Sequence, residues 1–240
     1  MRTTKIKILS AFTLLLLGTS SCIEELFIEG NGMARTEIRN DEGFNEISSS
    51  GDFEIHVSPG TSYSVEITAE SNLLPYISTN VDGKKLKIKT TGAHSLRQTL
   101  PIEIYITTPT LKGLALSGSG FIKTGSFMSD EFDISLSGSG DIITDISCDE
   151  LNSGVSGSGS ITATGDALRS KLFISGSGKI KLYNLEQDDC EAVISGSGDV
   201  FVNASRTLDA RISGSGRVYY VNHPTITTSI SGSGAVVNKN

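Results

Sequence analysis

The chain has 240 residues and a net charge of −7, with 27 Asp and Glu against 20 Lys and Arg. No basic run or aromatic-interleaved patch offsets this charge, so we expect no binding to nucleic acid. The chain has 26 glycines, only 5 prolines and no tryptophan. The absence of tryptophan argues against a wide aromatic core. The many glycines and few prolines indicate glycine at regular positions within folded structure and not a disordered linker.

Residues 1–21 are typical of an export signal. Arg2, Lys5 and Lys7 precede the apolar run "ILSAFTLLLLG", which is too short for a permanent membrane span. The small residues that follow end at Cys22 and resemble a bacterial lipoprotein cleavage box, except that Thr19 stands where leucine is usual. The resemblance implies a lipid on Cys22 that holds the protein at a membrane. A simple secretory signal that ends near a cysteine is the alternative.

Residues 22–43 are predicted to be a tether. Glu24 and Glu25 follow the cysteine and resemble the acidic export signal of surface-displayed lipoproteins in the Bacteroidetes. We therefore expect an outer-membrane lipoprotein that faces the cell exterior, with retention in the periplasm as the alternative. Without the signal the chain keeps 17 basic and 27 acidic residues, so its surface is more acidic still.

Residues 44–115 predict N-terminal β coils with a hairpin excursion. The stretch "ISSSGDFEIHVSPG" (47–60) is a degenerate form of a motif that recurs later, and we interpret it as an early coil. The segments "YSVEITAE", "KKLKIKT" and "PIEIYITTP" alternate like half-exposed strands. Asp82-Gly83 between two of them predicts a hairpin turn. We expect the excursion to cap the first coils.

Residues 116–240 repeat the motif Ser-Gly-Ser-Gly every 18 to 20 residues. A fixed period of this length indicates one supersecondary unit stacked on its neighbours. Aliphatic residues, mostly β-branched, stand directly before each motif and two residues after it, which favours strands. The predicted fold is all-β: a right-handed parallel β-helix, or solenoid, with about 18–20 residues per coil, continuous with residues 44–115. The motifs begin at Ser117, Ser137, Ser156, Ser175, Ser195, Ser213 and Ser231.

The repeated motif allows two backbone conformations. If it is extended, its glycines face inward with the aliphatic residues and its serines line a flat outer face. If its glycines have positive φ, the serines could point inward. We favour the extended form, and we predict that the serine face binds a partner. The candidate residues are Ser117, Ser119, Ser137, Ser139, Ser156, Ser158, Ser175, Ser177, Ser195, Ser197, Ser213 and Ser215.

Reactive constellations are not evident in the sequence. His56, His94 and His223 lack metal-ligand spacing, and no nucleophile elbow or phosphate-binding loop is written. A calcium ladder would need Asp after nearly every motif, but that position holds Phe121, Asp141, Ser160, Lys179, Asp199, Arg217 and Ala235. We predict no catalytic residue, no metal and no cofactor.

A disulfide between Cys148 and Cys190 is not expected. The two cysteines occupy different positions of coils that lie two steps apart, so their backbones should be too far apart for a bridge.

The combination of export signal, "GFNEISSSGDFEIHVSPG", "VDGKKLKIK" and repeated "ISGSGDV" resembles the putative auto-transporter adhesin, head GIN domain family. The resemblance spans residues 44–240 and implies a β-helical fold and a role in adhesion. We therefore predict a non-catalytic, lipid-anchored surface protein that binds a polysaccharide, host glycan or surface protein. The alternatives are an envelope spacer that forms homo-oligomers through its coil ends, and a carbohydrate-active β-helix enzyme.

Overall fold

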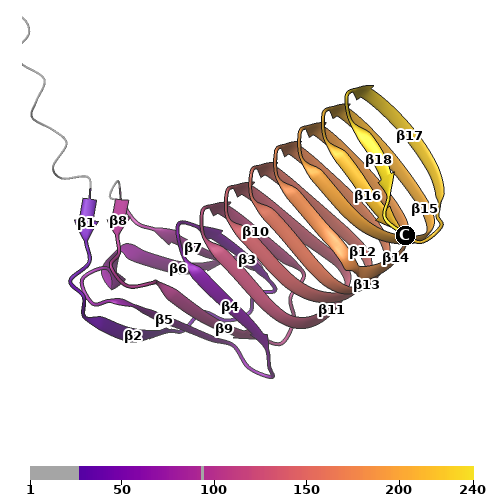
Figure 1. Ribbon diagram of the computed structural model, residues 1–240. Helices are drawn as coiled ribbons and strands as arrows, with labels where there is room; N and C mark the ends of the chain where they lie inside the picture. Colours follow the sequence, from indigo (N-terminus) through magenta and orange to yellow (C-terminus); the bar gives the residue numbers. More distant parts are fainter. Residues whose placement is uncertain (1–26, 93–94) are drawn as a thin grey trace, which may run out of the picture.

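The computed structural model describes residues 27–92 and 95–240. The export signal, Cys22 and His94 lie outside these residues. Figure 1 shows a stack of coils that runs from an N-terminal β region to the C-terminal end of the chain. The predicted all-β solenoid of parallel coils is confirmed.

Each coil of the stack is almost continuous β structure and pairs in parallel with the next. Equivalent motif residues share one register: Gly118 lies beside Gly138, and Gly138 beside Gly157. The coils therefore repeat at the predicted 18 to 20 residues. The strands are β10 (Gly113–Gly118), β11 (Phe121–Gly138), β12 (Asp141–Gly157), β13 (Ser160–Gly176), β14 (Lys179–Gly196), β15 (Asp199–Gly214), β16 (Arg217–Val221), β17 (Thr225–Gly232) and β18 (Ala235–Asn238).

The N-terminal part extends the same stack, and its degenerate early coil is confirmed. Strands β3 (Glu46–Ser50) and β4 (Glu54–Pro59) form a coil that pairs in parallel with β10 and β11. Strands β7 (Lys85–Thr90) and β9 (Glu103–Thr108) pair in turn with β3 and β4, so they lie beneath that coil although they follow it in sequence.

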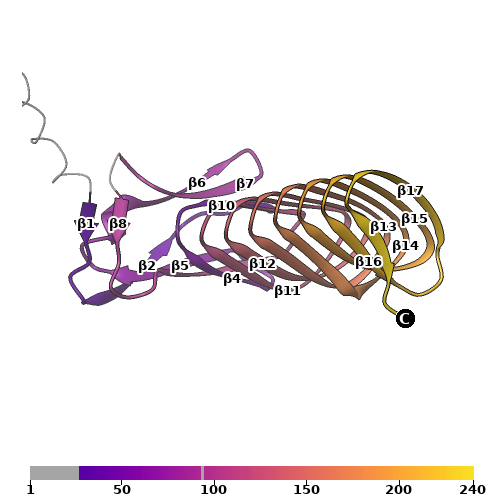
Figure 2. The same ribbon diagram turned by 45° about the horizontal axis from the view of Figure 1, so that its top comes forward.

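Antiparallel strands close this end of the stack. Strand β6 (Ile77–Asp82) pairs with β7 through the predicted turn at Gly83, and this hairpin extends beyond the coils in Figure 2. On the other face, β5 (Ser64–Glu70) pairs antiparallel with β9, and β2 (Ala34–Arg39) with β5. One short 3₁₀ helix, Leu74–Tyr76, connects β5 to β6.

The predicted tether of residues 22–43 is wrong for most of its described length. Strand β1 (Phe27–Glu29) pairs with β8 (Ser95–Arg97), and β2 pairs with β5. Their alternation of apolar and polar residues is too short to predict strands, and their partners are 26 or more residues away in sequence. The chain is therefore part of the fold from Phe27 onward.

A buried carboxylate fastens this N-terminal segment to the body. Glu70 is fully buried and accepts hydrogen bonds from the backbone N–H of Gly32 (2.6 Å) and from both N–H and Oγ1 of Thr99 (2.9 and 2.6 Å). A side chain on Gly30 would overlap this carboxylate. The Thr99 hydroxyl is the main cause that lowers the pKa of Glu70 to about 2, with backbone N–H groups adding to it.

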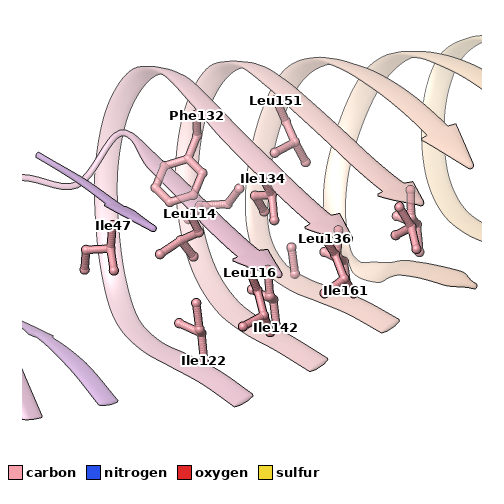
Figure 3. Packing of buried hydrophobic residues seen from close by; sticks show 14 of the residues in the cluster. Ile47, Leu114, Leu116, Ile122, Phe132, Ile134, Leu136, Ile142, Leu151 and Ile161 are labelled. Atoms are coloured by element: carbon pink, nitrogen blue, oxygen red, sulfur yellow. The ribbon is translucent and has the colours of Figure 1, made fainter. Parts of the chain in front are cut away.

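The interior of the solenoid is filled by aliphatic columns. Figure 3 shows that residues of successive coils, such as Ile122, Ile142 and Ile161, point into one common core. All three have no exposed surface, and the residues before the motifs that precede the last coil, such as Leu136 and Ile174, are also buried. Both predicted aliphatic columns are confirmed. Burial of such side chains is the main favourable term for the coil stack.

The extended conformation expected for the motif is wrong, because the motif forms a corner. Its first glycine has positive φ in every coil, from 116° at Gly232 to 132° at Gly196. The strand ends there, and the next one begins three residues later, as from Gly138 to Asp141. Extended backbone could not make this change of direction. The serines nevertheless face outward, so the inward placement that we linked to positive φ is also wrong.

Close contact between coils explains why the corner needs glycine. The carbonyl of Gly118 accepts hydrogen bonds from the N–H groups of Ser139 and Gly140, both at 3.0 Å, and the pattern recurs along the stack. A Cβ atom on Gly176 would lie 2.6 Å from the carbonyl oxygen of Gly157. Because that neighbour is backbone, it cannot move aside without breaking the register of the coils.

We predict that Gly176→Ala lowers the free energy of unfolding by about 2–4 kcal/mol, because it combines positive φ with a backbone clash. The control is Gly154→Ala, since Gly154 lacks positive φ and has open space where a Cβ would point. Its effect should stay within ~0.5 kcal/mol in urea unfolding. Equal destabilisation by both substitutions would contradict the corner argument.

Glu70 should make stability depend on pH. Because its folded pKa is about 2 and its ordinary value is 4.5, its contribution is present above pH 4.5 and is lost as pH falls toward 2. Glu70→Gln should lower the melting temperature by several degrees at pH 7, because the amide cannot accept all of these hydrogen bonds. The difference from the parent should shrink below pH 4.5.

The matched control is Glu66→Gln, which removes one carboxylate from the half-buried middle of the same strand. If the melting temperature of Glu70→Gln lies below that of the parent by the same amount at pH 7 and at pH 3, the role assigned to the ionised carboxylate is contradicted.

Candidate binding face

The twelve predicted serines form two parallel rows along the corner of the solenoid. All twelve are exposed, and in the described part of the chain none of their hydroxyls has a protein hydrogen-bond partner. Neighbouring coils place successive serines about 4.8 Å apart. The flat face that we expected is thus a ridge, with the second serine of each motif on the turn itself.

A shallow hollow of about 470 Å³ lies on the strands that lead into the corner, and the motif serines of these strands follow its lining residues by two positions in the sequence. Outward residues of β11 to β14 form two columns on this face, next to Ser137, Ser156, Ser175 and Ser195. One column contains Ser135, Gly154, Phe173 and Val193, and the other contains Asp133, Asn152, Lys171 and Glu191.

Phe173 is the apolar centre of the hollow. Phe173 is 47% exposed. It occupies an outward position of the strand, as the exposed Ser175 does two residues later. The coil beneath it carries Gly154, where a Cβ would meet nothing within 4 Å. The ring therefore stands beside an open space instead of a packed neighbour.

Two of the three charged residues that line the hollow, Lys171 and Glu191, are in ion pairs. Lys171 Nζ lies 2.6 Å from Glu150 Oε1, and this contact lowers the pKa of Glu150 and raises that of Lys171. Arg211 pairs with Glu191 at 2.7 Å. Asn152 Nδ2 donates to Asp133 Oδ1 at 3.0 Å. Asp133 has no basic partner in the described chain, and Arg211 also pairs with Asp209 at 2.5 Å, so the rim keeps some negative charge. The hollow thus combines an exposed ring with hydrogen-bonding groups, which suits an uncharged ligand with one apolar face.

The sequence interpretation located the serine row but missed Phe173. A signal was present, because inward and outward residues alternate and Phe173 stands between two buried positions, Leu172 and Ile174. Its equivalents in the neighbouring coils are Gly154 and Val193. Alignment of the repeats on their motifs therefore places an aromatic residue at an outward position whose neighbours are small.

The other candidate residues do not converge on a site. The variable column after the motif, from Phe121 to Ala235, is aligned as predicted on the strands that leave the corner. His56 contacts Glu54 and stacks on Tyr105, and His223 is exposed near the chain end. Among residues 27–92 and 95–240, no group of three or more His, Cys, Asp or Glu residues is placed to hold a metal ion.

A second depression lies on the corner opposite the serines and is acidic. Asp166, Glu186 and Asp188 line it together with Asn203 and Asn222. Several of these groups bond to one another between coils, for example Asn222 to Asn203. The described side chains thus form a ladder that joins neighbouring coils.

The two described cysteines lie apart, as expected from their positions in the repeat. Cys148 aligns with Ala167 of β13, whereas Cys190 aligns with Ser170, three residues further along the same strand. Both side chains are free thiols in the buried core. Burial raises the pKa of Cys148 to about 11 and that of Cys190 to about 12.

The architecture defines a parallel β-solenoid with an antiparallel N-terminal end. Residues 43–224 of the chain match the family of the putative auto-transporter adhesin, head GIN domain, and the chain belongs to this family. The resemblance drawn from the repeated motif is thereby confirmed. No described helix has the length and apolar character needed to cross a membrane.

Solved structures share the fold. A putative adhesin from Bacteroides fragilis is 27% identical, with a TM-score of 0.84 over 88% of this chain and 100% of its own. A putative lipid binding protein from Parabacteroides distasonis is also 27% identical, with a TM-score of 0.76 over 89% and 100%. A putative adhesin from Parabacteroides merdae (20% identity, TM-score 0.73, 89% and 99%) supports the fold alone. No curated protein matches the chain.

We predict that both thiols react slowly with Ellman's reagent in the folded chain from Phe27 onward at pH 8. The reactive species is the thiolate, which the raised pKa values and burial make scarce. In denaturant without reductant, two thiols per chain should react at once. Rapid labelling of the folded protein, or fewer than two thiols after unfolding, would contradict the described core.

Proposed function

We propose that this protein is a non-catalytic adhesin, held at the outer surface of the cell by a lipid on Cys22, that binds a neutral glycan. The binding face is the hollow around Phe173 together with the adjoining serine row. The family and the similarity to putative adhesins support the role in adhesion. The lipoprotein-like signal in the sequence supports the anchor.

The observation that carries the ligand class is the exposed Phe173 ring beside hydrogen-bonding groups and paired charges. A sugar ring has one face of C–H groups and a periphery of hydroxyls. The apolar face can cover Phe173, which removes apolar surface from water. The hydroxyls can bond to the amide of Asn152 and to the hydroxyls of Ser156 and Ser175.

The repeated serine row favours an extended ligand over a single sugar. Its hydroxyls follow one another at the spacing of the coils and have no partner in the described protein. A polysaccharide that runs along the stack could contact several of them at once, so weak individual contacts would add up.

Binding without hydrolysis agrees with the state of the carboxylates in this face. Glycoside hydrolysis uses two free carboxyl groups on either side of the scissile bond. Here Glu191 is paired with Arg211, and Asp133 accepts a hydrogen bond from Asn152. Asp133 is exposed and Glu191 is half-buried, so neither lies in an enclosed apolar pocket.

Two substitutions test the proposal on a panel of neutral and acidic polysaccharides. Phe173→Ala removes the ring and should weaken binding roughly 10-fold for any neutral glycan that the parent binds. Gly154→Val fills the hollow and should abolish binding without loss of stability, since valine suits an exposed strand position.

The control is Leu168→Ala, which removes a half-exposed apolar side chain from the opposite corner. Affinity measured by biolayer interferometry should be unchanged by this control. Full binding by both hollow variants, or binding of the parent to lipid vesicles instead of glycans, would refute the proposed site.

A further inference from the structure

The two ends of the solenoid differ in how their open strand edges are protected. The 16-stranded sheet of the described chain has four edge strands: β2 and β6 at one end, and β17 and β18 at the other. An open edge presents unpaired N–H and C=O groups to any other strand. Charged side chains are one of the usual means that prevent such pairing.

The N-terminal edge carries charges, whereas β17 carries none and the charged residue that follows β18, Lys239, lies over the Tyr219 ring. Strand β2 contains Arg35, Glu37 and Arg39, and β6 ends at Asp82 beside the lysines of β7. By contrast, none of the 14 residues in 225–238 is charged. In a chain of net charge −7, this absence of charge lets two copies approach one another at β17 with little repulsion.

The core columns are also open at this edge. Leu208 and Ile212 of β15 are 1% and 2% exposed, but their equivalents in β17, Ile226 and Ile230, are 36% and 43% exposed. Every residue of β17 is exposed. The coil therefore ends with apolar side chains that would be buried if another strand continued the stack.

We propose that two copies of this chain join end to end through their last coils, with β17 of one copy antiparallel to β17 of the other. A two-fold axis perpendicular to the stack lets each copy present the same surface to its partner. The columns that contain Ile226 and Ile230 then continue across the junction. This inference does not depend on the proposed glycan site.

The charged N-terminal edge limits the assembly to two copies. Head-to-tail contacts would have to place the uncharged β17 edge against β2 or β6, where strands are antiparallel and charged. Such contacts would also generate open filaments, because head-to-tail interfaces do not close without a suitable rotation. The pairing of like ends instead covers the β17 edge of each copy and leaves the two charged ends outside.

The test is the mass of the chain from Phe27 onward, measured by light scattering and sedimentation velocity at roughly 1–100 µM. We expect the unmodified chain to be a dimer that dissociates on dilution. Thr228→Lys should yield a monomer, because Thr228 lies in an inward-facing column at the open end. The lysine can reach solvent in the monomer but faces the partner copy in the dimer.

The matched control is Asn80→Lys, which adds the same charge to an exposed position of β6 at the opposite end. This variant should remain a dimer. If Thr228→Lys fails to fold, hydrogen exchange of the unmodified chain decides, since amides of β17 should exchange faster on dilution while those of β13 do not. A monomer at every concentration, growth beyond dimers, or exchange of β17 that is independent of concentration would overturn the inference.

Discussion

The close approach of backbones at the glycine corner is the constraint on which the rest of the structure depends. Each coil must turn sharply between its two faces and still bond to the coil beneath. The first motif glycine provides the positive φ, and its carbonyl accepts N–H groups from the next coil, as in the contact of Gly118 with Gly140. A side chain at this position would separate the coils, so the stack requires glycine at every turn.

Because the interior is filled, interaction with other molecules falls to the outer surface. The aliphatic columns leave no exposed area on residues such as Ile142 and Ile161. Outward residues carry no such packing constraint, and they differ from coil to coil. This freedom permits a ring such as Phe173 beside Gly154, and it also permits paired charges such as Lys171 and Glu150. The buried residues of the coils are thus nearly uniform, whereas many of the outward residues vary.

Much of the fold could be predicted because the repeat exposes it directly. The period, the strands and the two buried columns follow from the spacing of motifs and aliphatic residues. The conformation of the motif was predicted wrongly, because side-chain alternation treats every residue as extended and does not anticipate a turn. The segment 27–39 was also misjudged, since its strands pair with residues that are distant in sequence.

The sequence by itself determined which residues are buried, which repeat and which face outward, because alternation along a strand is a local property. The tertiary structure alone decided which outward residues meet across coils. Coils differ in length by one or two residues, and register shifts near the corner opposite the serines absorb the difference, as between Thr162 and Gly165. The pairing of Glu186 with Asn203 and the position of β7 and β9 beneath an earlier coil depend on this stacking, which no single coil specifies.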